Sequence, residues 1–298
     1  MSGLPPLAIA TDTLLTILFY IYATGTVLNG TILITIASYR QKLFKTSADR
    51  LIAALVFACF VWAVGRAVFH AMQAMNWTNI RDSGACAYSN VCLIMIFCLN
   101  VHLAMERYFQ IREHPHTVKM TYLLYTVVSV CIGCIIWMFS TSPTSDGVKP
   151  DLEPQRSAWV AVFSFTYGMT VLLMAWLYTR TYQYSKRQFD ENPALATFFM
   201  SDRDSMKDDP ETLGLVRIRV EREILTRCLL LSLSLVLCYA PFYAYQIQSY
   251  RTGVIPTFDL TLAYYDGVAI LLSSDCIITP VLVFLFKKEV REAMKFWA

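Results

Sequence analysis

The chain has 298 residues, of which 56% are hydrophobic and only 16% are charged, and its net charge at neutral pH is +3. Soluble domains carry about a quarter charged residues, so the composition argues against a water-soluble fold. The small net charge gives no reason to expect a nucleic-acid partner. The chain from Met1 to Thr13 has no basic segment and contains two prolines, so no secretory signal peptide is expected.

Apolar stretches follow one another along the chain, each about as long as the ~20 residues that cross a bilayer. In order they are Leu14–Ser38, Leu51–Ala71, Ala85–Ala104, Met120–Ser140, Ala158–Tyr178, Ile224–Gln246 and Leu260–Phe286. Lipid cannot satisfy open backbone groups, so each stretch is expected to be a helix. We therefore predict an all-α membrane protein whose residues 1–298 form one seven-transmembrane helix bundle. Residues 185–213 are expected to be a loop, and 287–297 a short amphipathic helix on the membrane surface.

The basic residues predict the orientation of this bundle. Most of the 25 lysines and arginines fall in alternate connections: 40–50, 107–119, 180–227 and 287–295. The positive-inside rule then places the N-terminus outside and the C-terminus in the cytoplasm of a multi-pass cell-membrane protein. Asn76 begins an Asn-Trp-Thr glycosylation sequon in the first outside loop of this topology.

The cysteines and histidines indicate no metal centre. All nine cysteines except Cys86 lie well inside apolar stretches, where cysteine usually acts as a small buried hydrophobe. The four histidines form no ligand set with the acids of the spans, and no serine or cysteine nucleophile has an evident base. We expect neither a metal site nor an enzyme.

A charged triplet marks the cytoplasmic end of the third span. Glu106, Arg107 and Tyr108 are consecutive there, and a second acid, Glu221, lies at the same end of the sixth span. An arginine on one helix and a glutamate on another can form a pair across the mouth of a bundle, which opening would break. Simple anchoring of the helix end by Arg107 is the alternative interpretation.

Two of the predicted spans contain a proline. Pro241 follows Cys238-Tyr239-Ala240 in the sixth span, and Pro280 follows Thr279 in the seventh. Proline removes a backbone hydrogen bond and kinks a helix, so either span could swing its cytoplasmic end. A static kink is the alternative.

These features, in this order, resemble the rhodopsin-like family of G-protein-coupled receptors over nearly the whole chain. Glu106-Arg107-Tyr108 is similar to its D/E-R-Y motif, Cys238-Tyr239-Ala240-Pro241 to its CWxP motif, and Thr279-Pro280 to the start of NPxxY. Asn29 falls where the family keeps an asparagine in its first helix. The resemblance implies that Arg107 engages a heterotrimeric G protein, that Glu221 restrains it, and that Tyr239 is the switch below the ligand.

The chain also departs from the family's pattern. Cys59 stands near the place of the second-helix aspartate that binds sodium, Val283 replaces the NPxxY tyrosine, and residues 142–157 contain no cysteine. Ser273 occupies the place of the retinal-linked lysine, so no retinal cofactor is expected. Ser89 falls near the aspartate of amine receptors, which argues against an amine ligand.

The family's ligand pocket would be lined from the outer halves of spans three, five, six and seven. The candidates here are aromatic or uncharged hydrogen-bonding side chains with one acid, which suit a small organic ligand of unknown identity. They are Ser89, Asn90, Phe242, Tyr243, Gln246, Tyr265, Asp266 and Ser273. Ordinary helix packing is the alternative for each of them.

Asp275 lies deep in the seventh span. Acids within a membrane are costly and often functional, so a role with an ion, water or a proton is one interpretation. A structural hydrogen bond to Asn29 or Asn100 is the other interpretation.

For the function of the whole chain, a receptor is the main interpretation. The alternatives are a transporter or channel and a non-signalling decoy receptor.

Overall fold

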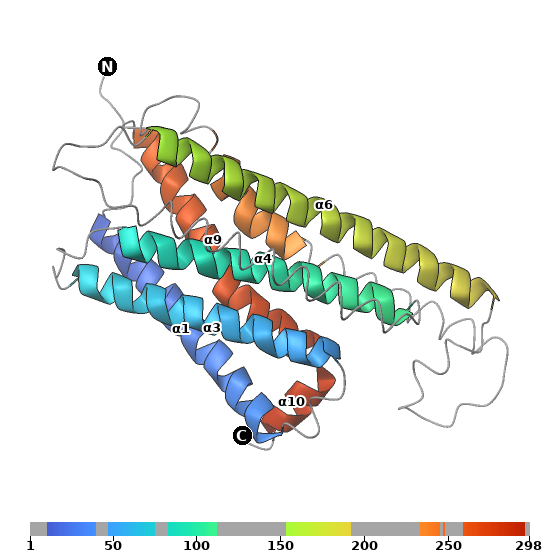
Figure 1. The fold of residues 1–298 in the computed structure, drawn as a ribbon. Coiled ribbons are helices and arrows are strands. Elements are labelled where there is room, and N and C mark those ends of the chain that lie inside the picture. Colours follow the sequence, from blue (N-terminus) through green and yellow to red (C-terminus); the bar gives the residue numbers. More distant parts are fainter. Residues whose placement is uncertain are drawn as a thin grey trace.

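The computed structural model describes residues 11–39, 47–74, 83–111, 153–191, 230, 233–244, 247 and 259–295. All regular structure within these residues is helical (Figure 1). The labelled helices are α1 (Thr11–Ser38), α3 (Ser47–Ala74), α4 (Ser83–Ile111), α6 (Glu153–Glu191), α9 (Asp259–Phe286) and α10 (Lys288–Lys295). A further apolar helix, Leu233–Ala244, precedes α9 in the chain.

The predicted spans agree with these helices wherever both can be compared. The first, second, third, fifth and seventh each lie inside one helix, and the sixth includes Leu233–Ala244. The fourth, Met120–Ser140, lies outside the described residues. The predicted loop from Ser185 was wrong at its start, because α6 continues to Glu191. Its last turns are rich in good helix formers such as Lys186 and Arg187, and Pro193 follows where a helix is expected to stop.

Within the described residues, three helical segments are long and apolar enough to cross a membrane: Thr13–Ser38, Asp49–Met72 and Asp266–Phe286. Two shorter apolar helical segments are Val91–Glu106, which is part of α4, and Leu233–Ala244. The structure therefore supports an all-helical protein that associates with a membrane. The full set of seven crossings, with its orientation, stays a prediction.

The outer faces of the helices are apolar. Tyr20, Val27 and Ile34 recur at seven-residue spacing on α1, and all three side chains are exposed. Phe165, Leu172 and Trp176 are likewise exposed on α6. A helix at a water surface carries polar residues on its outer face, so these stripes are the arrangement expected of helices that face lipid.

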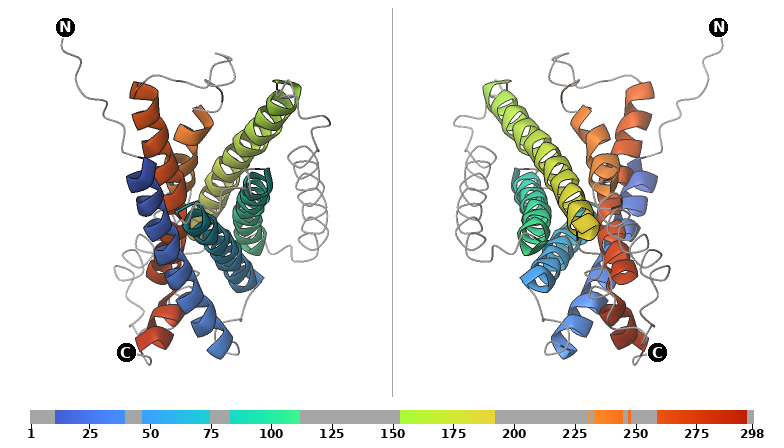
Figure 2. Two further views of the ribbon diagram at one scale, coloured as in Figure 1. Left: turned by 90° about the vertical axis from the view of Figure 1, so that its left-hand side faces the viewer. Right: turned by 90° about the vertical axis from the view of Figure 1, so that its right-hand side faces the viewer.

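The helices pack in a continuous series. α1 packs against both α3 and α9, α3 packs against α4, and α4 packs against α6 (Figures 1 and 2). Large side chains fill the centre, among them Trp62, Tyr22, Phe97 and Tyr239, each at most 1% exposed. The core is thus built from aromatic rings contributed by several helices, which limits how far any one helix can shift alone.

Gly25 allows α1 and α9 to approach each other closely. A Cβ atom at this position would overlap the Cys276 thiol and lie only 3.1 Å from the carbonyl oxygen of Cys276. Gly168 on α6 differs, because a Cβ atom there would meet nothing within 4 Å. Gly25 is therefore required by packing, and this contact fixes the level at which α1 meets α9.

α10 is attached to the bundle by apolar and charged contacts. Val290 and Ala293 are buried, and Val290 belongs to a buried cluster with Ile32 and Ile36 of α1. Lys287, at the junction of α9 and α10, forms an ion pair with Asp49 in the first turn of α3. A short helix is therefore present within the predicted range 287–297, from Lys288 to Lys295, and its position on the membrane surface stays a prediction.

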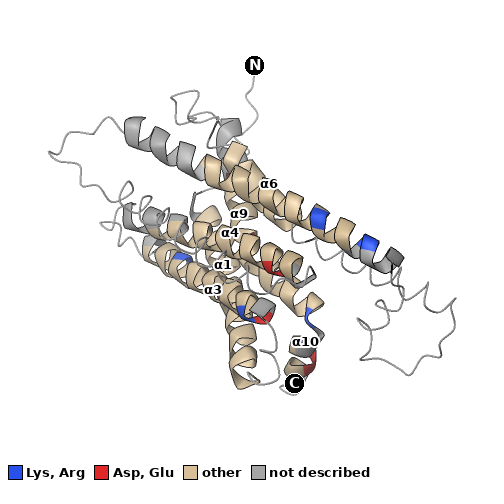
Figure 3. Cartoon of the chain, turned by 45° about the vertical axis from the view of Figure 1, so that its right-hand side comes forward, with Lys and Arg blue, Asp and Glu red and all other residues tan. Residues whose placement is uncertain are grey.

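Charged residues are sparse among the described parts of the helices (Figure 3). Beyond the first turn of each, the three long apolar segments contain only Arg66 and Asp275 as charged residues. Five cysteines, Cys59, Cys92, Cys98, Cys238 and Cys276, are buried with free thiols, as predicted for small hydrophobes. The two charged residues that remain inside the spans each require a physical explanation.

Candidate functional site

A buried hydrogen-bonded group joins helix Leu233–Ala244 to α9. The Tyr239 hydroxyl donates to Asp275 Oδ2 at 2.6 Å, and Thr279 Oγ1, one turn further along α9, donates to Asp275 Oδ1 at 3.2 Å. The Asp275 side chain is 3% exposed and Tyr239 is fully buried. Both carboxylate oxygens thus have a hydroxyl donor, as a buried acid requires. We call Tyr239, Asp275 and Thr279 the polar node.

Aromatic rings from other helices hold Tyr239 in place. Phe97 of α4 meets its ring edge to face at a centroid distance of 4.8 Å. Tyr167 of α6 lies 6.5 Å from the Tyr239 ring and 5.0 Å from the ring of Tyr243. Edge-to-face and offset pairs at these distances are favourable. The ring that binds Asp275 is therefore positioned by α4 and α6 as well as by its own helix.

Asn29 of α1 supports the backbone of α9 beside the node. Pro280 has no N–H group, so the carbonyl of Cys276, four residues earlier, cannot receive its usual helical hydrogen bond. Asn29 Nδ2 donates to that carbonyl at 2.8 Å, and also to the carbonyl of Gly25 at 2.8 Å. In a membrane helix such a freed group has to be satisfied by a neighbouring helix. Asn29 therefore compensates for Pro280.

The expected hydrogen bond between Asp275 and Asn29 or Asn100 is not formed. Asn29 donates to Cys276 and Gly25, and Asn100 Nδ2 donates to the carbonyl of Ile96 in its own helix at 3.0 Å. Cys59 of α3 is fully buried and close enough to Asp275 and Thr279 to interact electrostatically. In this polar core α9 thus supplies the acid and α3 a thiol.

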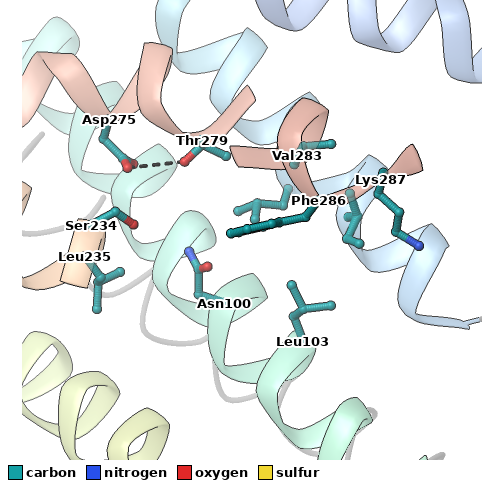
Figure 4. A pocket seen from close by; sticks show the side chains of 11 residues that line it. Asn100, Leu103, Ser234, Leu235, Asp275, Thr279, Val283, Phe286 and Lys287 are labelled. Carbon is teal, nitrogen blue, oxygen red and sulfur yellow. Dashed lines mark hydrogen bonds between the residues drawn. The ribbon is translucent and has the colours of Figure 1, made fainter. Parts of the chain in front are cut away.

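A small cavity of about 40 Å³ lies against the node. Figure 4 shows Asp275 and Thr279 at one end, Asn100 and Ser234 beside them, and Phe286 and Lys287 further along α9. The remaining lining is apolar and includes Ile52, Leu55, Leu103, Leu235 and Val283. A water molecule needs at least ~10–15 Å³ of such space and two to four polar partners. The cavity can therefore hold a few waters between Asp275 and the α10 end of the bundle.

A second buried cluster surrounds the ring of Tyr22 in α1. Three residues on successive turns of α3 contact it: Trp62 edge to face at 5.5 Å, the guanidinium of Arg66 at 5.6 Å, and His70 stacked at 5.6 Å. The Tyr22 hydroxyl shares a hydrogen bond of 2.8 Å with Ser273 of α9. Three successive turns of α3 thus pack on one tyrosine.

The predicted outer-pocket residues fall into different groups. Phe242 and Tyr243 are partly buried, while Asp266 and Ser273 are buried. Ser273 Oγ is occupied by Tyr22 and by the carbonyl of Ala269, at 2.7 Å. Ser89, Asn90 and Tyr265 lie in helices, but their side chains lie outside the described residues, as does Gln246.

The predicted cytoplasmic lock is only partly within the described structure. Glu106 is buried near the end of α4, and Tyr108 faces Trp176 of α6 at 6.1 Å between ring centroids. The Arg107 side chain, Glu221 and the sequon at Asn76 lie outside the described residues. A pair between Arg107 and Glu221 therefore remains a prediction.

The sequence reasoning missed Tyr22, Arg66 and His70 as a cluster. The signal was available, because Trp62, Arg66 and His70 recur every four residues along one helix face.

No protein-family model matches the chain, and no curated protein matches it significantly.

Proposed function

We propose that the chain is a seven-helix receptor, similar to the rhodopsin-like kind, that couples an outside ligand to a heterotrimeric G protein. The observation that carries the proposal is the hydrogen bond between Tyr239 and Asp275. It joins two helices that each contain a proline, Pro241 and Pro280. Proline allows a helix to bend, so a direct link between these two helices is suited to coupling a movement of one to the other.

The surroundings of the polar node favour a signal that passes along the bundle. On one side of Tyr239 are the partly buried rings of Phe242 and Tyr243, which were predicted to line the ligand pocket. On the other side is the cavity between Asp275 and Lys287. A ligand that displaces Tyr239 would weaken its bond to Asp275 and alter the packing around that cavity. Such a two-state arrangement is what a receptor requires.

The experiment is ligand-independent nucleotide exchange on G proteins, with the full chain in membranes and variants matched for surface expression. Glu221→Ala should raise the basal rate, because it removes the acid proposed to restrain Arg107. Arg107→Ala should abolish the rate, because it removes the residue proposed to engage the G protein. Glu223→Ala removes an equal charge two residues away in the sequence and should behave like wild type.

A second function is favoured by one observation. Asp275 is a buried carboxylate beside a polar cavity, as in many ion and proton pathways. A transporter or channel would show ion or proton flux in sealed vesicles that Asp275→Asn abolishes. Flux of that kind, together with exchange rates that do not differ among the variants, would replace the receptor proposal. An absence of both activities would favour a decoy receptor.

A further inference from the structure

Arg66 is a cation within the apolar helix α3. It lies in the membrane-length segment Asp49–Met72, about two turns from its end. A charged side chain inside such a segment is costly unless it is paired or reaches water, so the neighbours of Arg66 decide what it can bind. The Arg66 side chain is only partly buried, so its guanidinium remains accessible to a partner.

The neighbours of Arg66 compensate its charge only in part. The guanidinium carbon lies 5.6 Å from the ring centre of Tyr22 and 5.5 Å from that of Phe69. Cation–π contacts of this length are favourable. The Tyr22 hydroxyl is close enough to the guanidinium to interact with it electrostatically. Among the described residues no carboxylate forms an ion pair with Arg66, although Asp266 is buried on α9 toward the same end of the bundle.

The cluster holds the guanidinium in a fixed position. Tyr22 is 1% exposed and is packed between Trp62 and His70, which occupy the turns of α3 before and after Arg66. Ser273 of α9 fixes the Tyr22 hydroxyl at 2.8 Å. Three helices therefore orient one arginine. Arginine has five N–H donors in a planar fork, and Tyr22 can accept no more than two of them through its single oxygen.

We propose that Arg66 binds the acidic head group of an amphiphilic ligand, and that Tyr22 positions Arg66 for it. A carboxylate matches the guanidinium fork with two parallel hydrogen bonds. Apolar side chains stand beside Arg66 on α3, with Val68 exposed and Phe69 partly buried, and such surroundings favour a carboxylate carried on a hydrocarbon body over a free inorganic anion. The guanidinium fork also pairs with a phosphate in this way, so the acidic group could be the carboxylate of a free fatty acid or the phosphate of an anionic bilayer lipid. The site does not depend on coupling to a G protein.

The test is a binding measurement on the purified full chain in nanodiscs of zwitterionic phosphatidylcholine. Oleate is the probe, methyl oleate is its uncharged match, and the readout is a saturable rise in apparent melting temperature. Oleate should stabilise the wild type and methyl oleate should not. Arg66→Gln should weaken oleate binding roughly tenfold or more, the loss expected for a charge-assisted pair. Tyr22→Phe should weaken it less, since it removes only a positioning contact.

Two further variants keep the result interpretable. Arg180→Gln removes an exposed arginine from α6 and should bind oleate like wild type. Should Arg66→Gln fail to fold, Arg66→Lys keeps the charge but loses the fork, and it should still weaken binding measurably. Equal stabilisation by methyl oleate would exclude a free acid as the ligand, and folded Arg66 variants that respond like wild type to both oleate and phosphatidic acid would overturn the proposal.

The source of the acidic group is decided in a parallel arm. Nanodiscs that contain phosphatidic acid replace added oleate, with the same Arg66 variants. Arg66-dependent stabilisation by phosphatidic acid alone would assign the acidic group to a bilayer lipid, whereas stabilisation by oleate alone would assign it to a free acid. No Arg66-dependent stabilisation in either arm would remove the site.

Discussion

Tyr239 and Asp275 form a hydrogen bond of 2.6 Å between two helices in the buried centre of the molecule. A hydroxyl donor to a carboxylate gives a short and strong contact, since the acceptor can carry charge. Both side chains are almost fully buried, so bulk water cannot replace either of them as a hydrogen-bond partner. Loss of the bond would leave a polar group buried without its partner, which costs more than the bond itself contributes.

Tyr239→Phe should therefore destabilise the protein by about 1–3 kcal/mol. The substitution keeps the ring that packs on Phe97 and removes only the hydroxyl. The apparent melting temperature of the purified protein in micelles measures the change. Tyr243→Phe is the control, because Tyr243 is only partly buried and makes ring contacts with Tyr167. It should shift the melting temperature little.

Asp275→Asn tests whether the two residues act as a pair. An asparagine keeps an oxygen that can accept from one hydroxyl, but it cannot accept from both Tyr239 and Thr279 with equal strength. The combined loss in Tyr239→Phe with Asp275→Asn should be smaller than the sum of the single losses, by about 1 kcal/mol. Additive losses would show that the bond is not an energetic unit. In the receptor proposal, Asp275→Asn also alters the basal exchange rate.

Asn29→Ala should cost about 1–3 kcal/mol, because it leaves the Cys276 carbonyl without its donor. Pro280→Ala restores a backbone N–H at the position that normally bonds that carbonyl. We therefore expect Asn29→Ala to cost less in the Pro280→Ala background than in wild type. Thermal unfolding of the four proteins gives this coupling. An equal cost in both backgrounds would mean that Asn29 stabilises α1 in another way.

The sequence allowed the helices to be predicted, because a length of about 20 apolar residues is a strong constraint. Tyr239, Thr279 and Asp275 could also be identified from the sequence, because a polar residue stands out within an apolar stretch. The hydrogen-bond partner of each polar side chain could not be predicted. Asn29 was expected to bind Asp275, yet the carbonyl freed by Pro280 takes its amide instead.

Which polar groups bond to each other depends on the rotation of each helix about its own axis and on its position along the bundle relative to its neighbours. The order of residues in the sequence determines neither of these. Gly25 sets the level of α1 against α9, and that level brings Tyr22 to Ser273. The cluster at Arg66 was missed for the same reason. The four-residue spacing of Trp62, Arg66 and His70 along α3 is visible in the sequence. The ring that they contact, Tyr22, belongs to α1 and lies about forty residues earlier in the chain.

Gly25→Ala should destabilise the protein by about 1–3 kcal/mol, the usual cost of overpacking a tight contact. The new methyl group would overlap the Cys276 thiol. Gly168→Ala is the matched control: its Cβ atom meets nothing within 4 Å, so the better helix propensity of alanine should stabilise α6 by up to ~1 kcal/mol. Chemical unfolding of both variants checks this contrast. Cys276→Ala should relieve part of the Gly25→Ala cost, and no relief would place the strain elsewhere.

The ion pair between Lys287 and Asp49 should hold α10 against α3 with a modest free energy. Its side chains are 30% and 11% exposed, so water screens the pair and a coupling of about 1 kcal/mol is expected. Asp49→Asn and Lys287→Gln, alone and together, give that coupling through hydrogen exchange of the α10 amides. Hydrogen exchange of the α10 amides should be faster in each single variant than in wild type, and only slightly faster again in the double variant. High salt should reduce the difference between wild type and the variants. Lys186→Gln removes an exposed lysine of α6 and should leave α10 unchanged. Protection that survives both substitutions would mean that the burial of Val290 and Ala293 alone docks the helix.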